Sequence, residues 1–178
     1  IPRLRVYILD LGISGASRRK LDALAVRYRR TLHYVKLDDL KSRIPFPVDT
    51  GRFDLSTLGR LFIGEMLPSG VTRCLYLDCD TVVLGSLRKL WQFPIEPAIA
   101  GAVQEPTIYR QVKEIIGLDR KDPYYNAGML LVDLKEWRRQ GMGQQMLAYY
   151  QSMDGRLPAN DQDVINHVLK GRIRTLPP

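Results

Sequence analysis

Cysteine is scarce in this chain of 178 residues, and the two that it has, Cys74 and Cys79, are poorly placed for a disulfide bond. They stand five positions apart in one strand-like stretch, where an odd spacing directs side chains to opposite faces of a sheet. We therefore expect no bridge between them. Two unpaired thiols are typical of a reducing compartment.

Long apolar runs are also missing, since no stretch approaches the length of a membrane-spanning helix and no signal peptide is recognisable at the start. The composition is ordinary, with 45% hydrophobic and 26% charged residues, and the length suffices for a sizeable core. These features predict a single domain over residues 1–178, soluble and cytoplasmic. Because the chain enters a strand almost at once and lacks an initiator methionine, we expect a fragment of a longer protein.

Acidic residues are outnumbered, because 19 Asp and Glu face 27 Lys and Arg and leave a formal net charge of +8. The excess cations gather at Arg18 to Lys20, at Arg27 to Arg30 and at Arg138-Arg139. Solvated helix faces are the usual explanation of such runs. Attraction to an anionic acceptor or peripheral association with a membrane surface is the functional alternative, and it stays open. No basic and aromatic residues interleave on a sheet, so we predict no nucleic-acid partner.

Strand-like and helix-like segments alternate along the chain, which favours an α/β fold with a largely parallel central sheet. Strands are predicted over residues 3–9, 33–37, 74–77, 98–103 and 129–132. Helices are predicted over residues 15–30, 57–67, 108–117, 134–139, 142–152 and 161–170, with one or two turns over 86–91. Ser14 or Ser17 is expected to cap the first helix and Ser56 the second, with a loop over residues 38–55 between them.

Two aspartates end the most apolar of these strands. Asp78 and Asp80 follow the run Cys74 to Leu77 directly. Open α/β sheets bind ligands beyond the carboxyl ends of their strands. Carboxylates two residues apart can converge there on a hard cation such as Mg²⁺ or Mn²⁺, completed by phosphate oxygens of a ligand. The structural alternative is a turn cap beside a solvated carboxylate.

The same segment, Leu77 to Val83, also looks like the first motif of haloacid-dehalogenase-type phosphatases. In that case Asp78 would be a nucleophile and Asp80 a general acid or base. That motif normally opens its domain, whereas many residues of α/β pattern precede it here. Its later acidic pair has no good match either, since Asp161-Gln162-Asp163 fits poorly. This interpretation ranks second.

Other segments accompany the aspartates in a fixed order. They are Arg60-Leu61, Tyr76 to Val83, Leu87 with Leu90-Trp91, Tyr125 to Leu131, Leu134 to Arg138 and Asn160 to Asp163. In this order and spacing the chain resembles family 8 glycosyltransferases over essentially its whole length. That retaining group contains bacterial lipopolysaccharide galactosyl- and glucosyltransferases and glycogenin. The resemblance implies a GT-A fold, which is Rossmann-like with flanking helices, a UDP-sugar donor, and Mn²⁺ or Mg²⁺ as cofactor.

The resemblance also assigns roles at the metal and the diphosphate. Asp78 and Asp80 match the family's metal-binding aspartates, and Asp78 would also face the ribose and the donor sugar. Arg60 matches an arginine that holds the donor near its diphosphate and sugar. The structural alternative for Arg60 is a solvated charge on an amphipathic helix.

Further matches concern the sugar itself. Contacts with it would come from Asn126, Ala127 and Gly128, and from Glu105, where the family usually has aspartate. Asp161 and Gln162 match the residues nearest the reacting carbon, so they are the predicted catalytic pair. The structural alternatives are a turn asparagine at 126, a glycine at 128 that needs positive φ, and a helix N-cap with an acidic first turn over residues 160–163.

Two segments of the family pattern have no counterpart in this chain. One is the family's first strand, which holds uracil and ribose. The other is a C-terminal His-x-x-Gly-x-x-Lys-Pro-Trp segment, which supplies a third metal ligand. His167 lies in a helical pattern without the following glycine and lysine, so we expect it to be structural. His33, in a strand beside Tyr34, is expected to be a packing or surface residue.

The implied activity is metal-dependent transfer of a hexose, glucose or galactose, from a UDP-sugar to a glycan or lipopolysaccharide-type acceptor, with retention of configuration. The chain offers no unambiguous nucleophile. We therefore favour attack by the acceptor hydroxyl on the face that UDP leaves, with Asp161 and Gln162 supporting an oxocarbenium-like centre. A non-catalytic sugar-nucleotide-binding domain is an alternative from another class. A location at the inner membrane surface stays open, and the oligomeric state is undetermined.

Overall fold

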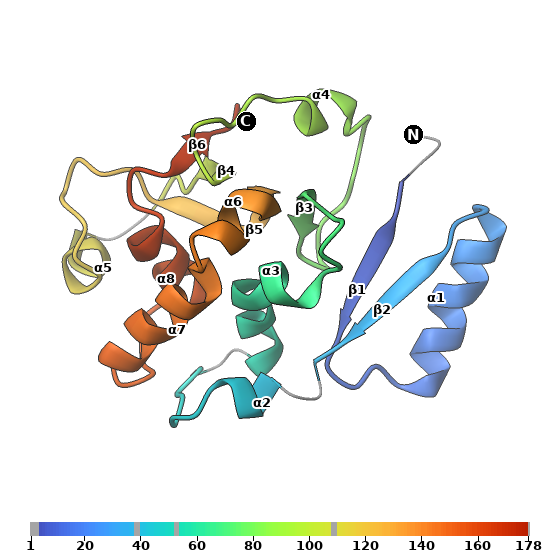
Figure 1. Cartoon of the computed structure of the whole chain (residues 1–178), viewed down its shortest axis with the longest axis horizontal. Coiled ribbons are helices and arrows are strands. Elements are labelled where there is room, and N and C mark those ends of the chain that lie inside the picture. The colour runs from blue at the N-terminus through green and yellow to red at the C-terminus, as the bar shows by residue number, and fades with distance from the viewer. Residues whose placement is uncertain (1–3, 38–39, 52–53, 108–109, 178) are drawn as a thin grey trace. The chain divides into compact units, whose positions relative to one another are not determined.

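The structure, a computed structural model, describes residues 4–37, 40–51, 54–107 and 110–177. The chain divides into two compact units, Ile1–Pro45 and Phe46–Pro178, each with its own strands and helices (Figure 1). In the described part of the chain, no helix has both the length and the apolar character needed to cross a bilayer. Cys74 and Cys79 are both free thiols, as expected.

The first unit is built around a βαβ arrangement. Strands β1 (Val6–Asp10) and β2 (Leu32–Lys36) pair in parallel, and helix α1 (Gly15–Arg27) connects them. The Ser14 hydroxyl accepts a hydrogen bond from the backbone N–H of Ser17 at 3.1 Å, so Ser14 is the cap of α1. Such a cap satisfies one of the N–H groups that the first helical turn leaves unpaired.

The predicted loop over residues 38–55 was partly wrong, because a short helix α2 (Leu40–Arg43) lies within it. One helical turn is too short to show apolar periodicity, so the sequence pattern had no means of revealing it. Residues 38, 39, 52 and 53 of the predicted loop lie outside the described residues, as do residues 108 and 109 of a predicted helix.

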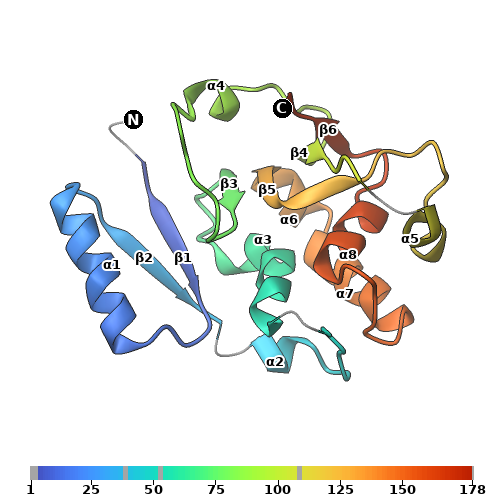
Figure 2. The same ribbon diagram turned by 180° about the vertical axis from the view of Figure 1, so that it is seen from behind.

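The second unit contains a sheet of four strands in the order β3-β5-β4-β6. These strands are β3 (Arg73–Leu77), β4 (Ala100–Gln104), β5 (Tyr125–Asp133) and β6 (Ile173–Thr175). Figure 2 shows β5 between β3 and β4. It runs antiparallel to both, and only β4 and β6 pair in parallel within this sheet.

The α/β class is therefore confirmed, but the expected largely parallel pairing is wrong for this sheet. An apolar run shows that a strand is buried on both faces, and parallel strands are usually buried in this way. Strand direction, however, depends on how the connections cross the sheet, and hydrophobicity does not record that. The error matters for the site, because antiparallel pairing brings the carboxyl end of β3 next to the amino end of β5.

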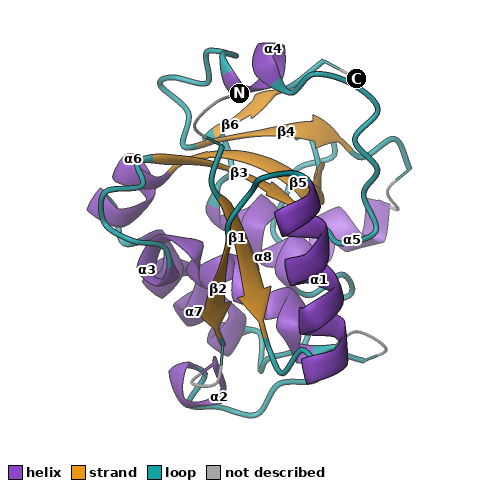
Figure 3. Cartoon of the chain, turned by 90° about the vertical axis from the view of Figure 1, so that its right-hand side faces the viewer, coloured by secondary structure: helices purple, strands orange, loops and turns teal. Residues whose placement is uncertain are grey.

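Helices and one 3-10 segment cover this sheet. They are the 3-10 helix η1 (Leu55–Phe62), α3 (Ile63–Met66), α4 (Arg88–Trp91), α5 (Arg110–Ile115), α6 (Leu134–Arg139), α7 (Met142–Ser152) and α8 (Asp161–Val168). Helices α6 and α7 have the bounds that periodicity predicts. Figure 3 shows α3, α7 and α8 on one side of the sheet and α4 on the other.

The helix predicted over residues 57–67 was wrong in type and in cap. It is a 3-10 helix followed by one α turn, and Asp54 rather than Ser56 caps it by accepting from the backbone N–H of Ser56 at 2.8 Å. Arg60 lies within this 3-10 helix and is buried, with 7% of its surface exposed.

The core of the second unit centres on β5, whose Leu130, Leu131 and Val132 are fully buried. Trp137 of α6 is also fully buried and lies against Gly64 of α3. A Cβ on Gly64 would come within 2.5 Å of Trp137 Cδ1, so only glycine allows this close approach between the two helices. This packing fixes α3, and with it the adjoining 3-10 segment.

Arg138 hydrogen-bonds to the backbone of a neighbouring segment and is not a free surface charge. Its guanidinium donates hydrogen bonds to five backbone carbonyls, those of Gly64, Leu67, Pro68, Ser69 and Val71. These carbonyls lie in α3 and the turn after it, where helix ends leave acceptors unpaired. The interpretation of Arg138 as a solvated or partner-binding charge is thus wrong. Arg139 does lie on the surface, paired with Glu136 at 2.7 Å.

We expect Arg138→Ala to lower the free energy of unfolding by about 2–4 kcal/mol, because several partly buried carbonyls lose a charged donor together. Arg139→Ala is the matched control and should leave stability nearly unchanged, because its ion pair is exposed. Urea denaturation of both variants measures the difference. Equal losses would contradict the role given to Arg138.

Candidate active site

The candidate site begins where β3 ends. The backbone N–H of Asp78 donates to the carbonyl of Gly128 at 2.8 Å, so the ladder between β3 and β5 continues to the first aspartate. A Cβ on Gly128 would lie 2.9 Å from Asp78 Oδ2, and the backbone of Gly128 does not have positive φ. The glycine is therefore needed for the close approach of the Asp78 carboxylate, not for a left-handed turn.

Arg60 joins three parts of the site. Its Nη2 lies 2.9 Å from Asp78 Oδ1, and its Nε lies 2.9 Å from Asp161 Oδ2. Its Nη1 donates to the carbonyl of Ala127 at 2.7 Å. The guanidinium also lies over the ring of Tyr76, 4.8 Å from the centroid. Arg60 is thus buried and holds these three groups together. The alternative of a solvated helical charge is wrong.

Tyr76 orients the same aspartate. Its hydroxyl donates to Asp78 Oδ1 at 2.8 Å, on the oxygen that Arg60 also contacts. Burial raises the pKa of the Tyr76 phenol, so it stays protonated and can donate. The orientation of Asp78 is therefore set by a cation, a phenol and the neighbouring Gly128.

Asp161 is the most perturbed carboxyl group of the site. Burial raises its pKa to about 6, and the negative charge of Asp78 adds to this, whereas Arg60 acts in the opposite direction. One guanidinium thus faces two carboxylates, so the three groups carry a net charge of −1 when both are ionised. Such a cluster attracts cationic charge, from a metal ion or from an oxocarbenium-like centre.

This pKa predicts a pH-dependent loss of stability. Because the folded-state pKa of Asp161 is raised above its unfolded value of 3.8, the native state binds the proton more tightly. The free energy of unfolding of the wild type, measured relative to that of Asp161→Asn, should therefore be greatest below about pH 4. It should fall by up to about 3 kcal/mol as the pH rises through about 6. Urea denaturation of both proteins across this range measures the difference, and a pH-independent difference would contradict the shift.

Gln162 is held at both ends of its amide. Its Oε1 accepts from the backbone N–H of Ala127 at 3.0 Å, and its Nε2 donates to the Tyr124 hydroxyl at 3.2 Å. Tyr124 in turn donates to Asp163 Oδ1 at 2.7 Å, and Asp163 Oδ2 accepts from the N–H of Ala159 at 2.6 Å. Since the single phenolic proton goes to the carboxylate, the Tyr124 oxygen must accept from Gln162. The chain of donors therefore fixes the orientation of the Gln162 amide.

Tyr124 and Asp163 are residues that the sequence analysis missed as parts of the site. Asp163 has no exposed surface, and burial raises its pKa while the bonds from Tyr124 and Ala159 lower it. The pKa of Tyr124 is also raised, first by burial and then by the charge of Asp163. No spacing rule connects residues 124 and 163, and only the packing of α8 against β5 brings them together.

The expected helix N-cap at residue 160 is not what the structure has. Asn160 precedes α8 but makes no side-chain cap, and its φ is +46°. Its amide donates to the Thr50 carbonyl at 3.0 Å and accepts from the Tyr150 hydroxyl at 3.1 Å. The acidic first turn of α8 is likewise turned inward, because Asp161 and Asp163 are both buried. The buried side chains of this segment therefore face the interior, and Asn160 does not cap the helix.

Glu105 and Asn126 form a pair beside this network. The Asn126 amide donates to Glu105 Oε2 at 3.0 Å, and its Oδ1 accepts from the N–H of Gly128 at 2.8 Å. The turn-type bond predicted for Asn126 is therefore present, together with a contact to Glu105. The structure thus brings together Arg60, Asp78, Ala127, Gly128, Asp161 and Gln162, with Glu105 and Asn126 adjoining. Their roles toward a substrate stay predictions.

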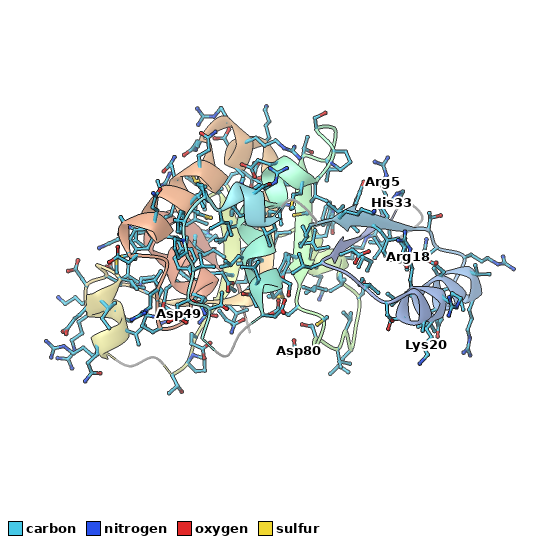
Figure 4. The ribbon with its side chains drawn as sticks, turned by 90° about the horizontal axis from the view of Figure 1, so that it is seen from below. Arg5, Arg18, Lys20, His33, Asp49 and Asp80 are labelled. Atoms are coloured by element: carbon cyan, nitrogen blue, oxygen red, sulfur yellow. The ribbon has the colours of Figure 1, made fainter. Side chains whose placement is uncertain are left out.

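Asp80 stands apart from this cluster. It is exposed on the loop after β3, where Figure 4 labels it. Across the described residues, no group of three His, Cys, Asp or Glu side chains is arranged to hold a metal ion. The donors fit a hard divalent cation in kind, since Asp78 and Asp80 both offer carboxylate oxygens. If both bound one cation, the remaining ligands would have to come from a diphosphate and water.

The two histidines are structural, as expected. His167 stacks on Tyr149 with ring centroids 3.6 Å apart, and its Nδ1 lies 2.6 Å from the carbonyl of Ile116. His33 stacks on Tyr7 with centroids 5.0 Å apart. Both rings are engaged in packing, and neither contacts the aspartates of the site.

Comparison with known proteins points in one direction. The model of the family described as glycosyl transferase family 8 matches residues 2–178. Lipopolysaccharide 1,2-glucosyltransferase of Escherichia coli is 32% identical over 120 residues, covering 66% of this chain and 36% of that protein. Lipopolysaccharide 1,3-galactosyltransferase of Salmonella typhimurium is 26% identical over 179 residues, covering 96% of this chain and 52% of that protein.

A solved structure agrees with this. The crystal structure of the galactosyltransferase LgtC, in complex with donor and acceptor sugar analogues, superposes with a TM-score of 0.85 at 28% identity. The match covers 97% of this chain and 62% of LgtC. The chain spans about half the length of the curated relatives it matches.

Proposed function

The chain belongs to glycosyl transferase family 8 and has the GT-A fold, and from this we propose that it carries the donor-side machinery of a retaining, metal-dependent hexosyltransferase. The donor would be a UDP-sugar with glucose or galactose, and the acceptor a glycan or lipid-linked saccharide. A cytoplasmic location at the inner membrane surface is part of the proposal. The observation that carries it is the bridge that Arg60 makes between Asp78 and Asp161.

The proposed division of labour follows the geometry. Asp78 and Asp80 would hold Mn²⁺ or Mg²⁺, which as a Lewis acid would stabilise the charge that builds on the departing diphosphate. Arg60 keeps Asp78 and Asp161 in place and compensates part of their charge. Glu105, Asn126 and Gly128 would contact hydroxyl groups of the sugar, and the hydrogen bonds that join them support this grouping.

At the reacting carbon, Asp161 and Gln162 would support an oxocarbenium-like centre. The bond from the anomeric carbon to the UDP oxygen breaks, and a bond to the acceptor oxygen forms on the same face. The acceptor proton leaves with the UDP oxygen. Gln162 is a weak nucleophile, and its amide is already engaged at both ends. A positioning and electrostatic role therefore suits it better than covalent attack.

The phosphatase alternative has little support. A nucleophilic aspartate needs a free carboxylate oxygen aimed at phosphorus. The short contacts of Asp78 with Arg60 and Tyr76 are both on Oδ1 and leave Oδ2 for such an attack, so what argues against this alternative is the family match, which covers nearly the whole chain. A non-catalytic binder would keep the same pocket groups, so activity itself has to separate it from a transferase.

The test is UDP release from the full-length parent protein with Mn²⁺ and a panel of UDP-sugars and saccharide acceptors. We expect release with one hexose donor, and Asp80→Asn should reduce it by at least about 10²-fold because one carboxylate ligand of the cation is lost. Lys135→Gln, an exposed change elsewhere, is the control. Donor binding without release would favour the binder, and phosphate release from monoesters alone would favour the phosphatase.

A further inference from the structure

The net charge of the protein is confined almost entirely to the first unit. Residues Ile1–Pro45 contain 11 Lys and Arg against 4 Asp and Glu, whereas Phe46–Pro178 contain 16 against 15. The first unit thus has a net charge of +7 and the second of +1, out of +8 in total. A charge so unevenly distributed points to an anionic partner of the first unit rather than to a general solubility device.

The two acidic side chains of this unit that the structure describes both have partners within the unit, Asp10 being buried and Asp22 exposed. Asp10 accepts from the backbone N–H groups of Gly12 and Ile13 at 3.0 and 2.7 Å, and its other oxygen lies 3.9 Å from Arg18. Asp22 accepts from the hydroxyl of Tyr34, on β2, at 2.8 Å. Both carboxylates therefore lie toward the strands, on the side of α1 away from Lys20 (Figure 4) and Arg27.

The outer face of α1 consists of Arg19, Lys20, Ala23, Leu24 and Arg27, all of them exposed, and exposed Val26 lies at its edge, one turn from Asp22. Positions 19, 23 and 27, and positions 20, 24 and 27, recur at the spacing of one helical face. Figure 4 shows Lys20 on the side of α1 away from the strands and Arg18 between the helix and the strands. The outer face thus presents cations and aliphatic side chains without an acidic residue.

The apolar members of this surface are unusually exposed. Leu24 is 50% exposed and Val26 77%, and Tyr28, just beyond the helix, is 63% exposed. Helix α1 has no buried residue at all. Exposed Arg29 and Arg30 follow directly. Large apolar side chains in a ring of cations gain little from a phosphate backbone in water, whereas a bilayer interface accommodates both kinds of group.

We propose that the outer face of α1, with Tyr28 to Arg30, binds the surface of an anionic lipid bilayer. The cations would lie at the headgroup phosphates, and Leu24, Val26 and Tyr28 would enter the boundary with the acyl chains. This surface uses none of the residues of the candidate active site. The proposal rests on the membrane location given under the proposed function and names the surface that would provide it, while its test does not depend on transferase activity.

Cosedimentation of the chain with lipid vesicles tests this. We expect binding to phosphatidylcholine vesicles that contain about 30 mol% phosphatidylglycerol, and none to pure phosphatidylcholine. Reversing three cations, Arg19→Glu, Lys20→Glu and Arg27→Glu, should weaken binding about tenfold or more. The matched control reverses Arg120, Lys121 and Lys135, which are exposed in the second unit, and should bind like the wild type. Circular dichroism checks that α1 persists in each variant.

A second variant, Leu24→Ser with Val26→Ser, separates a bilayer from other polyanions. On a bilayer it should lower vesicle binding severalfold while leaving binding to heparin unchanged. If this variant binds vesicles like the wild type, or if the control triple variant loses as much binding as the α1 variant, the proposal is overturned. Equal binding to neutral vesicles would overturn it as well.

Discussion

Arg60→Ala is expected to reduce UDP release by at least about 10³-fold, because it removes a group that contacts Asp78, Asp161 and the Ala127 carbonyl together. Two neighbouring carboxylates would then lose their shared counter-charge. Asp161, whose pKa Arg60 now lowers, would hold its proton to still higher pH. The site would lose both its geometry and the ionised state of one predicted catalytic residue.

Arg60→Lys separates charge from geometry. Lysine keeps the positive charge, but its compact ammonium cannot face two carboxylates and a carbonyl in the planar arrangement of a guanidinium. We expect it to restore part of the stability that alanine loses, while UDP release stays about 10²-fold below wild type. Steady-state rates and urea denaturation measure the two effects. UDP release near the wild-type rate in the lysine variant would mean that charge alone is required.

Tyr124→Phe is expected to lower kcat by about 10- to 100-fold, although Tyr124 does not contact the predicted metal ligands. The ring keeps its packing, but the Gln162 amide loses its acceptor and Asp163 loses a donor. Gln162 then keeps only the hydrogen bond from the Ala127 N–H, so its amide is held less firmly. Because a buried carboxylate also loses a hydrogen bond, stability should fall by about 1–3 kcal/mol.

Tyr149→Phe is the matched control. Its hydroxyl is buried and is without a hydrogen-bond partner in the described part of the chain. Replacing Tyr149 by phenylalanine should leave kcat unchanged and alter the free energy of unfolding little. In a background of Gln162→Ala, the rate effect of Tyr124→Phe should largely disappear if Tyr124 acts through Gln162. Fully additive effects on kcat would instead indicate that Tyr124 only supports the fold.

Much of the site was predictable because it lies on strand ends and helix starts that leave clear patterns. The apolar run before Asp78 predicted a buried strand, and the end of that run at Asp78 placed the two carboxylates at the end of the strand. The bounds of α6 and α7 followed from apolar periodicity, since their inward faces repeat at helical spacing. The family resemblance supplied the rest, because it rested on several separate segments in a fixed order.

Other features depended on contacts that have no local signal. The antiparallel direction of β5, the burial of Arg60 in a 3-10 turn and the inward direction of Arg138 all result from how distant segments pack. The Asp163–Tyr124–Gln162 chain joins residues 124 and 163 across the interface of α8 and β5. Hydrogen bonds of this kind obey distance and angle, not sequence spacing.

Asp78 and Asp80 show both what the sequence predicts and what only the fold decides. The sequence by itself determined that two carboxylates follow a buried strand, because burial and periodicity are properties of neighbouring residues. Only the tertiary structure decided that they differ: Asp78 is fixed by Arg60, Tyr76 and Gly128, while Asp80 remains exposed. The physical reason is that the electrostatic environment of a side chain is set by groups that the fold brings within a few ångströms, wherever they lie in the chain.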